Sequence, residues 1–146
     1  MAGNLGPGFG VNHAGLGLRW RGHADDGRQP RVQWYPLGAA TEFTLQKDMA
    51  QCRWRILPGP PAKAVYAEQP FSLRLDRPYW LRGEVATLAG GRNRYRNKIW
   101  AAGEPEPEAW AVESIEAPSR DFSSGGALFV AHRSDVTLRR VRIEPL

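Results

Sequence analysis

The stretch from Tyr79 to Trp110 constrains this chain more than any other. It contains two runs of alternating polar and apolar residues, 79–88 and 93–101, and the turn between them carries the adjacent glycines Gly90 and Gly91. Glycine supplies the positive φ angles that tight hairpins require, and a period of two is typical of strands. After the second run, residues 103–110 (GEPEPEAW, the proline corner) exclude a helix and lead into a third run. The stretch therefore predicts an antiparallel β-meander.

Further alternating runs lie before and after the meander. We expect strands over 15–21, 31–37, 41–46, 51–57, 71–75, 111–116 and 125–130, and a closing strand between Val136 and Ile143. The apolar residues of the closing run change parity at Arg139 and Arg140, which predicts a β-bulge there. Roughly ten short runs and no amphipathic helical window predict an all-β fold, and periodicity alone leaves a sandwich and a barrel open.

Length and composition indicate one globular domain. The chain has 146 residues, of which 42% are hydrophobic and 24% are charged. No apolar run reaches the roughly 18 residues that span a bilayer, and the N-terminal residues show no basic and apolar regions typical of a signal peptide. We expect a flexible glycine-rich lead over residues 1–13, a single domain over residues 14–146 and no membrane insertion, while the compartment stays undetermined.

The most pronounced candidate site is a basic ladder in the meander. Period two places four basic residues on one face of one strand, about 6.5 to 7 Å apart, namely Arg92, Arg94, Arg96 and Lys98. Cations at this spacing can hydrogen-bond to repeated acidic groups of a polysaccharide. The alternative is an ordinary solvated strand face, balanced by neighbours such as Glu84 and Glu113.

Parity divides the six tryptophans between core and surface. Three lie on the apolar side of their strands and are expected in the core: Trp20, Trp34 and Trp54. Trp80 shares its parity with Arg82 and Glu84, so we expect it to be exposed. Because an exposed aromatic plane can stack on sugar rings, the candidates for a sugar platform are Trp80, Trp100 and Trp110.

No residue pattern indicates catalysis or a metal. The single Cys52 excludes an internal disulfide and is expected to be a small apolar residue, and the three histidines, at positions 13, 23 and 132, lack the spacing of metal ligands. Glycosidases hold two carboxyl groups across a substrate groove, whereas the glutamates at positions 104, 106 and 108 alternate with prolines in a corner expected to be solvated. We therefore name no catalytic residue, no metal ligand and no cofactor.

Several motifs together resemble a known family. They are Tyr79-Trp80 at the start of a long strand, NKIW at 97–100, the proline corner, Gly125-Gly126 before an apolar strand, and the closing run DVTLRRVRI. From roughly Gly15 to its end, the chain resembles the concanavalin A-like lectin/glucanase jelly rolls, in particular the laminin-G-like modules of bacterial proteins. The resemblance implies an antiparallel β-sandwich (jelly roll) of two curved sheets, usually in extracellular or particle-associated proteins that bind glycans or act as adhesive spacers.

The chain departs from that family in two ways. Family members usually carry a first strand that pairs beside the closing strand, whereas here only the glycine-rich lead precedes Gly15. The sandwich is then abbreviated, the chain is a fragment, or another copy supplies the strand at the edge between Val136 and Ile143. Glucanases of this fold also carry alternating carboxylates on one strand, and this chain has no such strand.

Together these observations predict a non-catalytic glycan-binding or adhesive module that prefers anionic polysaccharide. The expected ligand-binding residues are Arg92, Arg94, Arg96, Lys98, Trp80 and Trp100. One alternative is a structural or assembly module whose missing N-terminal strand comes from a neighbouring subunit, forming a homo-oligomer. The second is a polysaccharide-active hydrolase or lyase. Nucleic acid binding is suggested only by the net charge of +5 and is disfavoured.

Overall fold

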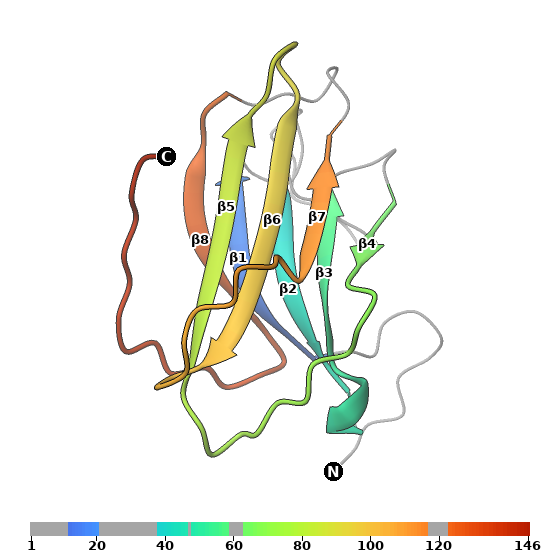
Figure 1. The fold of residues 1–146 in the computed structure, drawn as a ribbon, viewed down its shortest axis with the longest axis vertical. Helices are drawn as coiled ribbons and strands as arrows, with labels where there is room; N and C mark the ends of the chain where they lie inside the picture. The colour runs from blue at the N-terminus through green and yellow to red at the C-terminus, as the bar shows by residue number, and fades with distance from the viewer. Residues whose placement is uncertain (1–11, 21–37, 47, 59–62, 117–122) are drawn as a thin grey trace.

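The computed structural model describes residues 12–20, 38–46, 48–58, 63–116 and 123–146. These residues form two antiparallel β-sheets packed together, so the predicted all-β fold and β-sandwich are confirmed (Figure 1). The helical segment among them is a single 3-10 turn, η1 (Met49–Gln51). Within the described part of the chain, no helix is long and apolar enough to cross a membrane.

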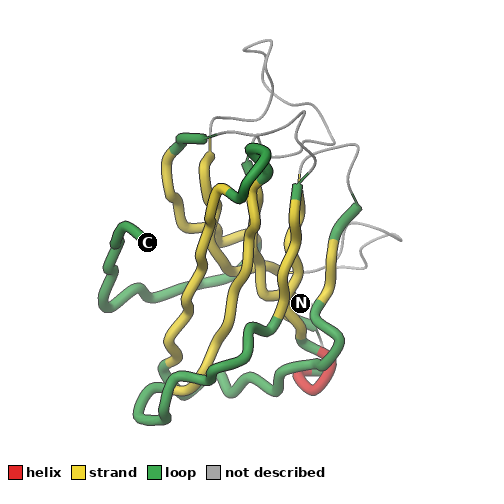
Figure 2. The backbone as a smooth tube through the Cα atoms, turned by 45° about the horizontal axis from the view of Figure 1, so that its top comes forward, coloured by secondary structure: helices red, strands yellow, loops and turns green. Residues whose placement is uncertain are grey.

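The large sheet has five strands in the order β4-β3-β2-β1-β8, whose labels Figure 1 shows and which Figure 2 draws in yellow. Its strands are β1 (Asn12–Trp20), β2 (Ala39–Leu45), β3 (Arg53–Pro58), β4 (Val65–Tyr66) and β8 (Gly126–His132). β1 pairs with β2 on one side and with β8 on the other. A Cβ atom at Gly15 would lie 2.0 Å from the backbone oxygen of Thr41, so this position in β1 accepts only glycine.

The small sheet has the order β5-β6-β7, formed by β5 (Tyr79–Thr87), β6 (Asn93–Ala101) and β7 (Val112–Ile115). β5 and β6 pair without interruption, from Tyr79 opposite Ala101 to Thr87 opposite Asn93. The turn between them carries Gly90 and Gly91, both with a φ of 80°. The meander is therefore confirmed, and glycine makes its tight turn possible.

The hydrophobic core lies between the two sheets. Alternation turns Phe43 and Trp54 of the large sheet toward Tyr95 of the small sheet, and none of the three side chains is more than 3% exposed. Phe43 and Trp54 meet edge to face, with ring centroids 5.4 Å apart. Cys52 is fully buried in the same cluster. Trp54 and Cys52 thus occupy the apolar interior that the sequence predicted for them.

Trp20 does not join this core. It is half-buried and lies outside the core cluster, although parity placed it there. The reason is a break in the strand: Arg19 has a φ of 52°, and the pairing of β1 with β8 shifts register between Gly17 and Trp20. Such an irregularity turns the following side chain to a new direction. Trp34 and the expected strand at 31–37 lie outside the described residues.

Two expected strands are absent from the part of the chain that the structure describes. Residues 71–75 form an extended loop, in which Phe71 N donates to Cys52 O but no ladder follows. The closing strand between Val136 and Ile143, with its bulge at Arg139 and Arg140, was a wrong prediction, because residues 135–146 run without a strand partner. Alternation fixes which side chains share a face, but a strand also requires a neighbouring backbone to pair with.

Several boundaries differ slightly from the sequence expectation. β1 begins at Asn12, so residues 12 and 13 belong to the sandwich rather than to the expected lead, while residues 1–11 lie outside the described part. β3 extends through Pro58, where a loop was expected to begin. β4 was not foreseen, because two residues beside a proline-rich stretch carry no readable period.

Candidate functional site

The outer face of the small sheet carries the predicted basic ladder. Alternation along β6 buries Tyr95 and Asn97 completely and turns three ladder residues to the opposite face, namely Arg94, Arg96 and Lys98. The fourth member, Arg92, lies exposed in the turn that precedes β6. Three of the four predicted cations therefore share one face, as the period of two indicated.

Glu84 binds two of these cations. The register of β5 and β6 places Glu84 directly opposite Arg96, whose Nε atom donates to Glu84 Oε1 over 2.7 Å. Arg94 Nη2 lies 3.5 Å from the same oxygen. Since the Glu84 side chain is only 7% exposed, its charge is compensated by these two guanidinium groups rather than by water.

The proline corner folds back onto the ladder through Glu106. Lys98 Nζ donates to Pro107 O over 2.6 Å and lies 2.9 Å from Glu106 Oε1, which also accepts from Arg82 Nη1 over 2.8 Å. The hydrogen bond from Lys98, and then that from Arg82, lower the pKa of Glu106 below its usual value. Most residues of the corner are exposed, as the sequence predicted, and Glu106 fastens the corner to the sheet.

Trp110, at the end of the proline corner, covers the same cations. Its ring centroid lies 4.3 Å from the Arg96 guanidinium carbon, 4.7 Å from Lys98 Nζ and 5.7 Å from the Arg82 guanidinium carbon. A cation at this distance from an indole face is attracted by its quadrupole. The ladder is therefore occupied by internal partners, and much of its charge is already balanced on this face.

Trp80 and Trp100, the remaining predicted ligand-binding residues, lie opposite each other in the register of β5 and β6. Trp80 is 40% exposed, as its parity indicated, and Trp100 is half-buried. Arg140 approaches the ring of Trp80 at 6.0 Å. The two tryptophans form an aromatic pair at the end of the outer face, next to the ladder in register.

A groove lies at the sandwich edge where β4 and β7 meet. It has a volume of about 520 Å³, and its walls come from the loop after β4 and from the start of β7. Four aromatic residues line it, namely Trp54, Tyr66, Phe71 and Trp110. Its carboxylate and amide side chains are Glu68, Gln69 and Glu113. Tyr66 is 49% exposed. Of these, the sequence singled out only Trp110 for binding, because β4 carries no strand pattern.

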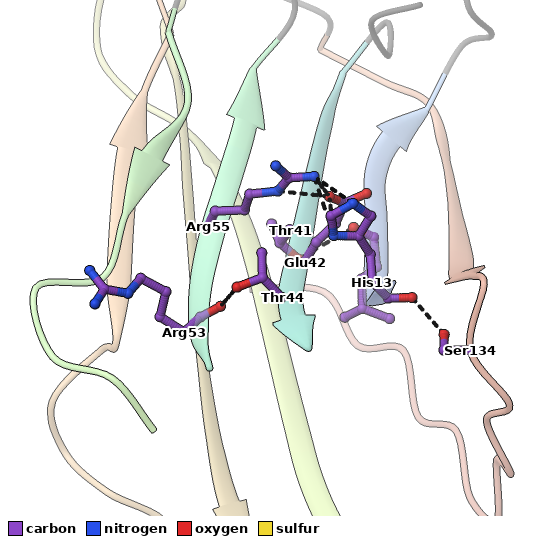
Figure 3. A network of polar contacts seen from close by, with 8 residues as sticks. His13, Thr41, Glu42, Thr44, Arg53, Arg55 and Ser134 are labelled. Atoms are coloured by element: carbon purple, nitrogen blue, oxygen red, sulfur yellow. Dashed lines mark hydrogen bonds and ion pairs between the residues drawn. The ribbon is translucent and has the colours of Figure 1, made fainter. Parts of the chain in front are cut away.

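The outer face of the large sheet holds a separate polar network (Figure 3). Arg55 donates to Glu42 Oε2 through Nη2 over 2.8 Å and through Nε over 3.1 Å, and its Nη2 also lies 3.1 Å from His13 Nε2. Burial, followed by the positive charges of Arg55 and His132, lowers the pKa of His13 to about 4. The uncharged imidazole of His13 lies beside the ion pair of Glu42 and Arg55, so these three side chains link β1, β2 and β3. We interpret this network as stabilising the sheet.

This network also brings together two histidines that sequence spacing kept apart. The pairing of β1 with β8 places His13 opposite His132, with ring centroids 5.5 Å apart. This contact follows from the register of β1 and β8. The spacing of the histidines along the chain does not reveal that register. Within the described ranges, no three histidine, cysteine, aspartate or glutamate side chains are grouped so that they could hold a metal ion.

Comparisons of the chain with protein-family models, with curated proteins and with solved structures found no match. What these two sheets do must therefore be argued from their own surfaces.

Proposed function

We propose that this chain is a non-catalytic glycan-binding module, a sandwich of the laminin-G-like kind, and that the groove beside Trp110 receives the sugar. The observation that carries the proposal is the composition of this groove. A cavity of about 520 Å³ that combines aromatic walls with carboxylate and amide side chains has the character of a small-molecule site. Aromatic planes pack on the apolar faces of sugar rings, while Glu68, Gln69 and Glu113 supply partners for hydroxyl groups.

The basic ladder has a supporting role in this proposal. Arg96 and Lys98 lie against the ring of Trp110, so they position the indole that forms one wall of the groove. Their charges are also shared with Glu84 and Glu106. Arg94 is also paired, with Glu84, so the anionic preference expected from sequence then depends chiefly on the exposed Arg92. Because the groove itself contains two glutamates, we expect neutral, hydroxyl-rich polysaccharides to bind at least as well as acidic ones.

The proposal is tested by binding to a panel of neutral and acidic polysaccharides at low and high salt. We expect saturable binding to a neutral member, with little dependence on salt, and a loss of about tenfold or more in affinity for Tyr66→Ala and Trp110→Ala. Trp80→Ala is the matched control, since it removes an exposed aromatic residue that does not line the groove. Near-ultraviolet circular dichroism shows whether each variant keeps its fold.

The outcomes of this experiment separate the two candidate surfaces. Binding only to acidic members, abolished by salt and by Arg92→Ala with Arg94→Ala, would place the ligand on the ladder instead of in the groove. Absence of binding to every member would overturn the glycan proposal altogether.

A hydrolase is the second candidate, because two carboxylates, Glu68 and Glu113, line the same groove. Paired carboxyl groups across a groove are the requirement for glycoside hydrolysis. Release of reducing ends from the same panel is the measurement. Turnover that is lost in both Glu68→Gln and Glu113→Gln would replace the binding module with an enzyme, whereas binding without turnover supports the non-catalytic function.

A further inference from the structure

The C-terminal segment, residues 135–146, has the side-chain pattern of a strand but no partner. Its apolar residues are largely uncovered, with exposures of 45% for Val136, 51% for Leu138, 52% for Val141 and 78% for Ile143. Among the described backbone hydrogen bonds, none involves this segment. Within the segment Arg142 forms an ion pair with Glu144, and Arg140 approaches the ring of Trp80. With Leu146, which is 76% exposed, five exposed apolar side chains lie in this short run and mark an interaction surface.

The sandwich is open on the same side. β8 is the last strand of the large sheet, and its Phe129 pairs with Leu16, whose side chain faces β5 of the small sheet. Phe129 therefore lies on the inner face, yet it is 47% exposed, and Ala127 and Ala131 of the same face are exposed as well. The exposure of this inner face indicates that none of the three described strands of the small sheet covers β8.

β5 offers the position for such a strand. Among the described strands it is the edge strand of the small sheet, paired with β6 on one side and with no described strand on the other. Since β5 packs over β1, and β8 is the next strand beyond β1, a strand added to β5 would lie over β8 and cover Phe129. The two sheets therefore frame one vacant strand position.

The C-terminal segment itself does not fill this position. In both views it stands apart from β5 as a loop (Figures 1 and 2), and in Figure 1 it runs in the same direction as β5. Both sheets are antiparallel throughout, so a strand that continues the small sheet runs opposite to β5 and to this segment. A copy of the segment related by a two-fold axis perpendicular to the strands runs in that opposite direction.

We propose that the vacant position beside β5 is filled by the C-terminal segment of a second copy of this chain, in a reciprocal dimer. Each copy donates residues 135–146 to the β5 edge of the other, and the two segments pair antiparallel with each other between the two small sheets. The exchange covers Phe129 and apolar residues of the segment and leaves no free edge on β5. It occurs at the sandwich edge opposite the groove, so it does not depend on the glycan proposal.

Sedimentation velocity of the full chain over about two orders of magnitude in concentration, centred on the micromolar range, tests the dimer. We expect a monomer–dimer equilibrium. The double variant Leu138→Asp, Val141→Asp should raise its dissociation constant by about tenfold or more, because it places charges where apolar side chains pack. The control is Leu75→Asp, which changes an 80% exposed leucine outside the interface and should dimerise normally.

A synthetic peptide of residues 135–146 provides a measurement that needs no variant to fold. We expect it to bind one peptide per chain and to convert the dimer to monomers. A chain that stays monomeric at every concentration would overturn the proposal, and so would a dimer that neither the peptide nor the double variant weakens. Equally tight binding of a strand-forming peptide of unrelated sequence would also overturn it, because the position would then accept any strand.

Discussion

The meander formed by β5 and β6 and the C-terminal segment carry the same kind of sequence and differ in structure. Both alternate apolar residues with arginines. In the meander, each strand has a partner in register, its inner residues meet the large sheet, and its outer cations meet Glu84, Glu106 and Trp110. The segment has the pattern alone. The difference shows that alternation determines which side chains share a face. A strand forms only where a neighbouring strand pairs with the backbone and a second sheet packs on that face.

The largest expected difference between the two regions is in amide hydrogen exchange. At low protein concentration, we expect the amides of β6 to exchange about a thousandfold or more slowly than those of residues 135–146, since β6 is hydrogen-bonded on both sides. Mass spectrometry of peptides from each region measures this ratio. At high concentration the ratio should shrink, because the exchanged segment becomes protected. Equal protection of both regions in the monomer would contradict the comparison.

Truncation of one apolar side chain in each region should separate them in stability. Tyr95→Ala empties a fully buried site in β6 and should lower the free energy of unfolding by about 3 kcal/mol or more. Leu138→Ala in the segment should change it by less than about 0.5 kcal/mol in the monomer. Urea denaturation at low concentration gives both values. A large loss from Leu138→Ala would mean that the segment packs within its own chain.

Ion pairs should show the same contrast at a smaller scale. Glu84→Gln leaves Arg94 and Arg96 without a nearly buried carboxylate, so we expect a loss of about 2 kcal/mol. Glu144→Gln removes an exposed pair with Arg142 and should cost less than about 0.5 kcal/mol. Thermal and denaturant unfolding of the two variants supply the comparison. Equal losses would mean that burial does not decide the strength of these pairs.

The smallest expected effect is the pH dependence of stability that His13 of β1 causes. The unfolded chain binds a proton at His13 below its ordinary pKa of 6.5, but the folded chain binds it only below about 4. Stability should therefore fall as pH is lowered through this window, by about 1 to 2 kcal/mol after allowance for partial exposure.

The groups that face His13 are Arg55, Glu42 and His132. Denaturation of the wild type and of His13→Asn at a series of pH values isolates the contribution of His13 to the pH dependence of stability. The variant should lose part of the slope between pH 6.5 and 4. An unchanged slope would assign the acid sensitivity to other groups.

Much of the fold could be predicted because its signals are local. The boundaries of β6, the turn at Gly90 and Gly91 and the core position of Trp54 follow from period, glycine and parity. The displacement of Trp20 could not be predicted, because it depends on a positive φ at Arg19. The closing run was wrongly predicted to be a strand, because alternation along the chain does not show whether a neighbouring backbone is there to pair with.

The site was less predictable than the fold. Three ladder cations share the predicted face, but the sequence could not show that Glu106 and Trp110 return to cover them, since a proline corner can turn in several directions. The placement of Tyr66 and Trp110 in one groove depends on the packing of β4 against β7, which are far apart in the chain. Such sites arise from tertiary approach rather than from spacing along a strand.

The position of β1 between β2 and β8 has a consequence for synthesis. During translation, β1 can pair with β2 early. The other edge of β1 stays unpaired until residues 126–132, which form β8, have left the ribosome. Contacts between segments so distant in the chain form late, and an open edge of a central strand invites pairing with other chains in the meantime. Newly made chains are therefore most prone to aggregate just before β8 emerges, and a chaperone that shields β1 would act in that interval.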